Sequence, residues 1–256
     1  MKRTALVLAV MLAAPAWAKG KPVPAPVPTG APLFQRAGLA YEAGKFAVAL
    51  DLYGRSAAEE GLTSGLAYNT GNAEFRLGRR GFAALWFERA REMSPRDGDI
   101  LFNLRVARNH LQDEDGTVWE TLDRVVTRHE MPWVVCVLAW LVLGSAGAAL
   151  WGLVSWRRVR GLVVAGAVLL AASSVWLIFR ERYSREPWAV VTAPVVEARS
   201  GPGENNPVGF TVPEGRRALV TGFRPGWVEI GVPSLGLKGW VRDDAVERIA
   251  IPEAVK

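Results

Sequence analysis

Two apolar runs without a charged residue constrain this chain more than any other feature of its sequence. They cover residues 133–156 and 161–179, which is 24 and 19 residues. As helices they would measure about 36 and 29 Å, and the apolar core of a bilayer is about 30 Å thick. Tryptophans near the ends of the runs are typical of a membrane interface. We therefore expect two transmembrane helices, with a buried helical hairpin of a soluble protein as the alternative.

The segment between the runs, residues 157–160, is only four residues long, so the two helices must form an antiparallel hairpin. Its three arginines favour the cytoplasmic side for the turn. Small residues at every fourth position would let the helices approach closely. These are Gly144, Ala148 and Gly152 in the first run and Ala167 and Ala171 in the second. No ionisable side chain lies within either run, which argues against a transport path.

The N-terminus has the pattern of a secretory signal peptide over residues 1–18. Lys2 and Arg3 precede an apolar stretch, and residues 16–18 form a small-x-small cleavage site. We expect cleavage after Ala18, with an uncleaved anchor as the alternative. Export and an even number of spans would place both soluble regions in the periplasm and the hairpin in the bacterial inner membrane. Five prolines in residues 19–32 predict an extended linker.

The charge balance excludes one class of function. The net charge of +6 comes from the leader and from the flanks of the apolar runs. Residues 31–128 hold 13 basic and 14 acidic residues, and residues 187–256 hold eight of each, so neither region has the basic face of a nucleic-acid-binding domain. The chain has one cysteine, Cys136, so it cannot form an intramolecular disulfide, and it has no Cys/His cluster for zinc. Its two histidines leave little material for acid-base catalysis.

The first soluble region contains an internal repeat with a period of 34 residues. The period pairs Ala37 with Gly71, Gly44 with Gly78, Ala49 with Ala83, Tyr53 with Phe87 and Ser56 with Ala90, and Pro95 follows. This order of small and aromatic residues resembles the tetratricopeptide repeat. The resemblance implies helix pairs that turn at the two glycines, with the aromatic residues filling the space between pairs. We expect two such repeats over residues 33–112, capped by a helix at 98–111.

The same resemblance implies a peptide-binding face on the first helices of the pairs. The 34-residue register places six side chains there: Tyr41, Tyr68, Asn72, Phe75, Arg76 and Phe102. For Phe75 and Phe102, packing in the core is the alternative. We expect Tyr41, Tyr68, Asn72, Arg76 and Phe102 to bind a partner. Asp99 stands where carboxylate-clamping repeats have a base, which argues against an acidic C-terminal tail as the ligand.

Two segments lead from the repeats to the membrane and beyond it. Apolar residues at helical spacing in residues 117–130 predict an amphipathic approach helix on the bilayer surface. After the hairpin, residues 187–250 form short β-rich runs separated by Gly and Pro, which predicts a small barrel. Its turn at 199–202, its turn at 213–215, and its strands at Trp227 and Trp240 resemble the bacterial SH3-type domain. We expect both tryptophans to fill the core.

The complete chain is thus expected to be a multidomain α plus β protein with a repeat region, a transmembrane hairpin and an SH3-like β-barrel. This order, with the runs at 68–72 and 95–104, resembles the BatE-like proteins of the Bat aerotolerance group. Such proteins are typically encoded beside a MoxR-type ATPase and von Willebrand A-type envelope proteins. The resemblance therefore implies partners among the von Willebrand A-type proteins.

The expected function is a membrane-anchored scaffold that binds envelope proteins. The alternative is a module that binds peptidoglycan through the SH3-type domain. The adjacent acid pairs Glu59-Glu60 and Asp243-Asp244 point apart in a helix or strand and do not converge as catalytic carboxylates would. We therefore expect no enzyme activity, no cofactor and no metal.

Overall fold

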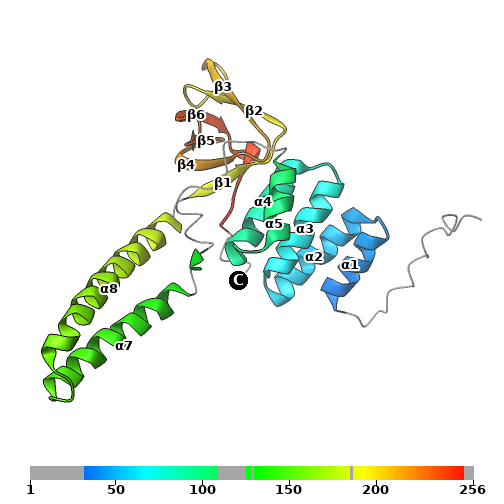
Figure 1. Ribbon diagram of the computed structural model, residues 1–256. Helices are drawn as coiled ribbons and strands as arrows, with labels where there is room; N and C mark the ends of the chain where they lie inside the picture. The colour runs from blue at the N-terminus through cyan, green and yellow to red at the C-terminus, as the bar shows by residue number, and fades with distance from the viewer. Residues whose placement is uncertain (1–31, 109–124, 128–129, 185–186, 251–256) are drawn as a thin grey trace, which may run out of the picture.

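A computed structural model of the protein describes residues 32–108, 125–127, 130–184 and 187–250. Within these residues, five helices pack beside a seven-stranded sheet, and two long helices form a separate hairpin (Figure 1). The fold is mixed α plus β, as expected. The expected signal peptide at 1–18 and nearly all of the linker at 19–32 lie outside the described residues.

The first five helices are two pairs, which turn at equivalent glycines, and a fifth helix that follows them. The helices are α1 Leu33–Glu42, α2 Phe46–Glu60, α3 Ser64–Arg76, α4 Arg80–Met93 and α5 Gly98–Ala107. Gly44 and Gly78 have φ of 76° and 80°, and the residue after each donates its N–H to a carbonyl five residues earlier. Glycine adopts this left-handed conformation without strain and therefore ends α1 and α3. These two glycines form the turns, as the 34-residue register predicts.

Equivalent positions of the two pairs also pack alike. The side chains of Tyr53 and Phe87 are buried, and Ala49 and Ala83 have no exposed surface. Gly71 on α3 faces the Phe87 ring on α4, and a Cβ atom on Gly71 would lie 2.7 Å from Cε1 of that ring. This helix crossing therefore has room for glycine only.

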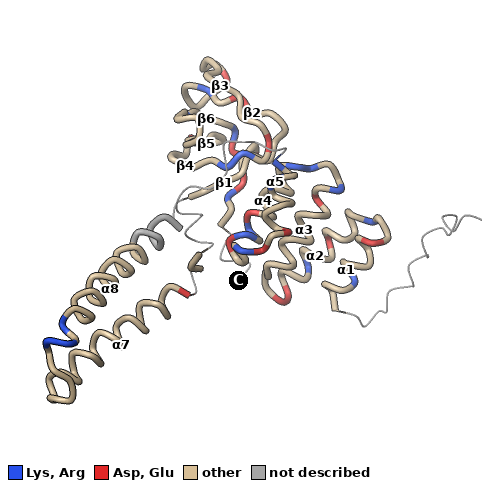
Figure 2. Tube along the Cα trace, viewed as in Figure 1, with Lys and Arg blue, Asp and Glu red and all other residues tan. Residues whose placement is uncertain are grey.

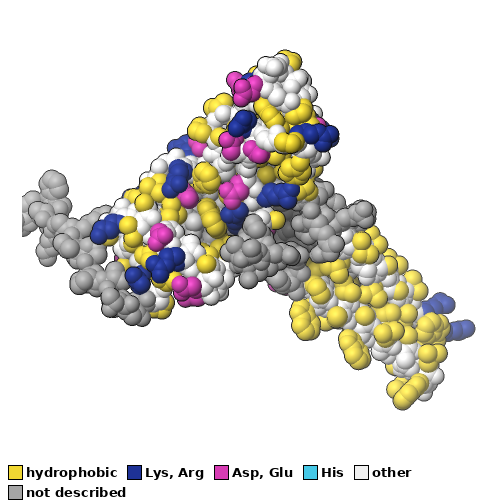
Figure 3. All heavy atoms as spheres, turned by 180° about the vertical axis from the view of Figure 1, so that it is seen from behind, with side chains coloured by type: hydrophobic (Ala, Val, Ile, Leu, Met, Phe, Trp, Pro, Cys, Tyr) yellow, Lys and Arg dark blue, Asp and Glu magenta, His cyan; other side chains and the backbone are white. Residues whose placement is uncertain are grey.

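The two hairpin helices, α7 Met131–Leu150 and α8 Trp156–Ser184, are long and apolar enough to cross a membrane. Charged residues stand only near the ends of the described hairpin (Figure 2). Its surface is largely hydrophobic, unlike that of the rest of the protein (Figure 3). The termini of α7 and α8 differ from the boundaries that we expected from the sequence, 133–156 and 161–179.

The turn of the hairpin lies before the arginines. Gly152 has φ of 74°, and Leu153 donates its N–H to the carbonyl of Ala148, so a left-handed glycine ends α7. Residues 157–160, which we expected to form the turn, lie in the first turns of α8. The basic cluster still marks the turn end of the hairpin.

The expected stripe of small residues is not what brings the two helices together. Gly144 and Gly152 have no heavy atom within 4 Å of an added Cβ, and Ala167 and Ala171 are exposed. The close approach is at Gly166, where a Cβ would lie 2.6 Å from Cγ2 of Val142. The packing face of α8 therefore lies one position away from the predicted alanine stripe.

An arginine from the helical region holds the segment that enters the hairpin. Arg96, between α4 and α5, donates to both carboxylate oxygens of Glu130, at 2.9 and 2.7 Å, and to the Val125 carbonyl at 2.8 Å. The backbone N–H of Thr127 donates to the same Glu130 carboxylate. Of the expected approach helix at 117–130, residues 117–124 and 128–129 lie outside the described residues; Val125 is helical and residues 126–127 are not.

The C-terminal region is one antiparallel sheet. Its strands are β1 Trp188–Val191, β2 Val195–Arg199, β3 Val208–Pro213, β4 Arg217–Arg224, β5 Trp227–Val232, β6 Leu237–Arg242 and β7 Val246–Arg248, with the 3-10 helix η3 Asp243–Ala245 before β7. The strand order is β3-β2-β6-β5-β4-β1-β7. Trp227 and Trp240 are half-buried, so neither is a fully enclosed core residue as we expected.

The expected SH3-like β-barrel does not close, because β3 and β7 are the two edges of the sheet and do not pair with each other. Two local features account for the open form. β2 joins β6 through only one residue pair, Arg199 with Trp240. At the other edge, the carbonyls of Arg248 and Ile249 accept hydrogen bonds from Arg89 of α4, at 2.9 and 3.2 Å. A helix side chain thus satisfies groups that another strand would otherwise pair.

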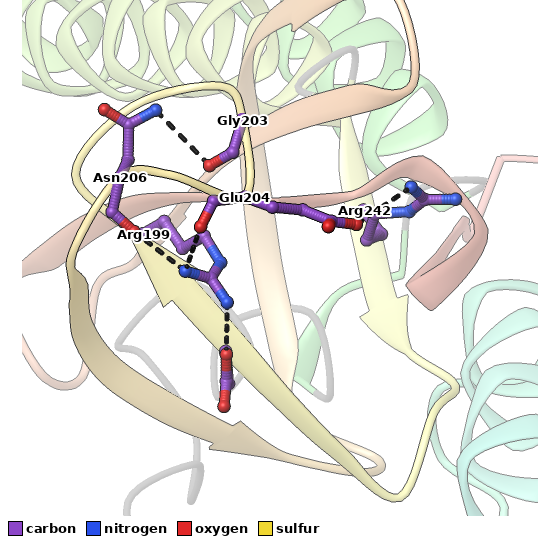
Figure 4. Close-up of polar contacts among 6 residues, drawn as sticks. Arg199, Gly203, Glu204, Asn206 and Arg242 are labelled. Carbon is purple, nitrogen blue, oxygen red and sulfur yellow. Dashed lines mark hydrogen bonds and ion pairs between the residues drawn. The ribbon is translucent and has the colours of Figure 1, made fainter.

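The turn after β2 is held by a side chain (Figure 4). Arg199 donates from Nη1 to the carbonyls of Glu204 and Asn206, both at 2.8 Å, and from Nη2 to the Glu197 carboxylate at 2.6 Å. These bonds order a loop that has no strand pairing of its own.

Helix α4 is buried on two sides, which the sequence analysis did not predict. One side packs on α3 and α5, and the other packs on the sheet. Val190 of β1 and Ile249 belong to the same buried cluster as Ala84 and Phe87 of α4. The helical region and the sheet therefore share a core.

Gly81, in the first turn of α4, makes the closest contact across this joint. Its N–H donates to Oε2 of Glu214 at 3.1 Å, and an added Cβ would lie 2.6 Å from the carbonyl oxygen of Thr192. A side chain at this position would push the helix off the sheet.

We predict that Gly71→Ala lowers the free energy of unfolding by about 1 to 3 kcal/mol, because the added methyl group overpacks the crossing with Phe87. Urea unfolding of the intact protein in detergent measures the change. The control is Gly54→Ala in α2, where no atom lies within 4 Å of the added Cβ and the change should raise stability by about 0.5 to 1 kcal/mol. Equal effects of the two substitutions would contradict this crossing.

Candidate functional site

The predicted partner-binding side chains lie on α1, α3 and α5, and four of them belong to two small clusters. In the first cluster, Asn103 of α5 donates from Nδ2 to the Tyr68 hydroxyl at 2.9 Å and to Oδ1 of Asn72 at 3.0 Å. All three side chains are half-buried, so part of each remains open to solvent. The structure thus brings Tyr68 and Asn72 together through a residue that the sequence analysis did not select.

The second cluster is aromatic and carries a positive charge. The Arg76 guanidinium lies over the Phe46 ring at 4.6 Å and near the Tyr41 ring at 5.9 Å, and the two rings meet edge to face with centroids 5.2 Å apart. Arg76 is exposed, and cation–π contacts of this kind orient an arginine without neutralising it. Tyr41 and Arg76 are therefore neighbours, and Phe46 is the member that sequence reasoning missed.

The remaining two candidates, Phe75 and Phe102, differ in their exposure to solvent. Phe102 is 59% exposed, so it can contact a partner. Phe75 is half-buried against the cluster that contains Phe87, which favours its packing role. We call the side of α1, α3 and α5 that carries Tyr41, Tyr68, Asn72, Arg76 and Phe102 the first-helix face.

One sequence signal could have pointed to Asn103. Asn69 and Asn103 are 34 residues apart, so an asparagine recurs at one position of the repeat. The sequence analysis followed the aromatic residues of the register and passed over this polar pair.

A buried carboxylate holds the opposite side of the helical region. Glu88 of α4 is enclosed and forms ion pairs with Arg108, at the end of α5, and with Arg91, at 2.7 Å. Arg108 also donates from Nε to the carbonyl of Gly215, in the turn between β3 and β4, at 3.2 Å. The three groups connect α4, α5 and the sheet.

The charges around Glu88 decide its protonation. Burial raises the pKa of the carboxyl, but Arg91, Arg108 and Arg217 lower it more strongly, so its pKa lies well below the ordinary value, at about 2. The carboxylate therefore stays charged at neutral pH. Such a group contributes stability above the pKa of the unfolded state and loses it as the pH falls toward the folded-state pKa.

The described residues contain no group of three or more His, Cys, Asp or Glu that could hold a metal ion. Cys136 lies on α7 and is exposed there. Comparison of the chain with protein-family models, with curated proteins and with solved structures finds no match. The geometry of the first-helix face is therefore the basis for assigning a function.

We predict that Glu88→Gln lowers the free energy of unfolding at pH 7 by about 3 to 5 kcal/mol, because it leaves the buried Arg108 and the half-buried Arg91 without their carboxylate. The stability of the unchanged protein should fall as the pH decreases from about 4.5 to about 2, and the variant should lose the part of this dependence that Glu88 contributes. Urea unfolding across this pH range measures both effects.

The matched control is Glu60→Gln at the exposed end of α2, which should change stability by less than about 0.5 kcal/mol. A similar cost for both substitutions would show that the Glu88 ion pairs do not hold the joint.

Proposed function

We propose that the protein is a membrane-anchored adaptor whose first-helix face binds partner proteins of an envelope assembly. The hairpin anchors it in the bacterial inner membrane, and the helical region and the sheet lie together in the periplasm. The protein does no chemistry on its partners in this proposal.

The apolar hairpin and its flanks support the anchor. α7 and α8 have the length and composition of membrane-spanning helices, with a basic cluster at their turn. The positive-inside rule favours the cytoplasm for this turn. The ion pair between Arg96 and Glu130 connects the helical region directly to the start of α7.

The adaptor proposal rests on a difference between two sides of the helical region: one side packs on the sheet, and the first-helix face does not. The sheet covers α4, where Gly81 and Arg89 bond to the sheet directly and Glu88 is linked to it through Arg108. The first-helix face carries a half-buried polar cluster and an exposed, aromatic-supported arginine. Aromatic residues and arginine are enriched where proteins bind one another. A partner would thus meet the first-helix face.

The partner class rests on the resemblance to BatE-like proteins, which implies von Willebrand A-type envelope proteins. The alternative, a peptidoglycan-binding module, would act through the sheet. Cosedimentation of the purified protein with sacculi separates the two. The adaptor proposal predicts that the protein does not cosediment, and the alternative predicts that it does.

We predict that the double variant Asn72→Ala, Arg76→Ala loses partner proteins and still folds. Arg76 is exposed and Asn72 is half-buried, so neither truncation opens a core cavity, and stability should change by less than about 1 kcal/mol while copurification of partners decreases. The measurement is affinity purification from native membranes with quantification of the retained chains. The control is Arg55→Ala, Glu59→Ala, an exposed pair with the same spacing on α2. Full retention by a folded Asn72, Arg76 variant would place the interaction on the sheet or the hairpin.

The proposed topology predicts the behaviour of a reporter enzyme that is active only outside the cytoplasm. Fused after Lys256 it should be active, and inserted after Ser155, in the turn of the hairpin, it should be inactive. The reverse pattern would place the first-helix face in the cytoplasm and contradict the proposal.

A further inference from the structure

One end of the sheet faces the membrane hairpin, as the strand register shows. Three residues separate Ser184, the end of α8, from Trp188, the start of β1. Trp188 pairs with Leu219 of the antiparallel strand β4, so residues 220–224 extend back past the start of β1. Trp227 pairs with Arg224 and with Arg242, so β5 begins and β6 ends there too. We call this end of the sheet, with Trp188, Arg224, Trp227 and Arg242, the anchor end. Figure 1 shows α8 ending beside it.

The anchor end contains a cavity of about 290 Å³. Phe223 and Trp227 supply its aromatic lining, Arg224 and Arg248 supply positive charge, and Asp243 is its one acidic residue. The Arg248 guanidinium lies over the Phe223 ring at 4.8 Å, and that ring is 52% exposed. In the part of the chain that the structure describes, neither arginine forms an ion pair with a carboxylate, and Arg224 donates from Nη1 to the Phe223 carbonyl at 3.1 Å. The cavity thus offers two guanidinium groups beside exposed aromatic surface.

The number of residues between the apolar part of α8 and β1 limits how far the cavity can lie from the membrane. The apolar part of α8 ends at Ile178, six residues before Ser184, which is about 9 Å of helix. From Ser184 to Trp188, where β1 begins, the chain spans at most about 14 Å. Residues 220–224 then run back by about 16 Å toward the hairpin. With the hairpin in the bilayer, Phe223 and Arg224 therefore lie at the depth of the lipid headgroups.

We propose that this cavity binds the headgroup phosphate of an anionic phospholipid, with the two arginines on the phosphate and the aromatic side chains against the glycerol and upper acyl region. Arginine suits a phosphate because its guanidinium donates in a bidentate geometry. Aromatic side chains are favoured at the membrane interface. The inference rests on the proposed function in one respect, because it requires the hairpin to span the membrane. Binding would hold the sheet, and through the shared core the helical region, in one orientation above the bilayer.

The test places a nitroxide on single cysteines of the full chain in nanodiscs. Pro225→Cys, with Cys136→Ala, reports on the hairpin between β4 and β5. Leu235→Cys, in the same background, reports on the opposite end of the sheet. The native Cys136 reports on the hairpin itself. Access of oxygen and of a water-soluble nickel chelate to each label is compared in discs of phosphatidylcholine and in discs that also contain phosphatidylglycerol.

We expect the label at residue 225 to lose nickel access and gain oxygen access only when phosphatidylglycerol is present, while the label at residue 235 stays in water. Arg224→Gln with Arg248→Gln should abolish this change, and the exposed pair Arg55→Gln with Lys238→Gln should preserve it. Equal protection without anionic lipid would overturn the proposal. So would protection of the residue 225 label in phosphatidylcholine discs by an added acidic peptide, which would mark the cavity as a peptide site.

The Cys136 label separates this inference from the proposed anchor. A label at residue 225 that stays in water in both discs, with Cys136 in lipid, would overturn the headgroup site and leave the anchor intact. A Cys136 label in contact with water would overturn the anchor, and the headgroup site with it.

Discussion

The enclosed carboxylate of Glu88 is the interaction on which the rest of the structure depends. It lies where α4, the end of α5 and the turn before β4 converge, and it is the negative charge that compensates the arginines around it. A buried charge is tolerated only when it is paired, so these elements can pack closely only in the arrangement that brings the arginines to Glu88. This requirement selects one way of docking the sheet on the helices.

The docking has a consequence for function. The helical region precedes the membrane hairpin in the sequence and the small β module follows it. Two such regions would by default be independent domains joined by a flexible link. Here Arg89 holds the last strand, Gly81 meets Thr192, and Val190 completes the core beneath α4. The chain therefore presents one body to its surroundings, with the first-helix face open and the anchor end beside the hairpin.

The sequence predicted what depends on local pattern and missed what depends on distant contacts. The turn glycines Gly44 and Gly78, the aromatic positions Tyr53 and Phe87, and the two apolar helices follow from spacing and hydropathy alone. The open sheet and the hairpin face at Gly166 do not, because they depend on which surfaces meet.

The candidate site shows the same division. Tyr68 and Asn72 were predicted from their place on one helix, but the contact that joins them comes from α5. Phe46 likewise lies on the helix after Tyr41 and 30 residues before its cation Arg76. Glu88 looks in the sequence like one charge among several on an amphipathic helix, and only the docked sheet shows that it is enclosed.

The central claim is that the helical region and the sheet fold as one unit through α4. Native-state hydrogen exchange of the full chain in detergent, resolved by peptide, tests it most directly. The account predicts that the amides of α4 and β1 open with the same free energy and the same dependence on urea, as members of one cooperative unit. Exchange of β1 at low urea while α4 stays protected would contradict it, and would make the sheet an independent domain.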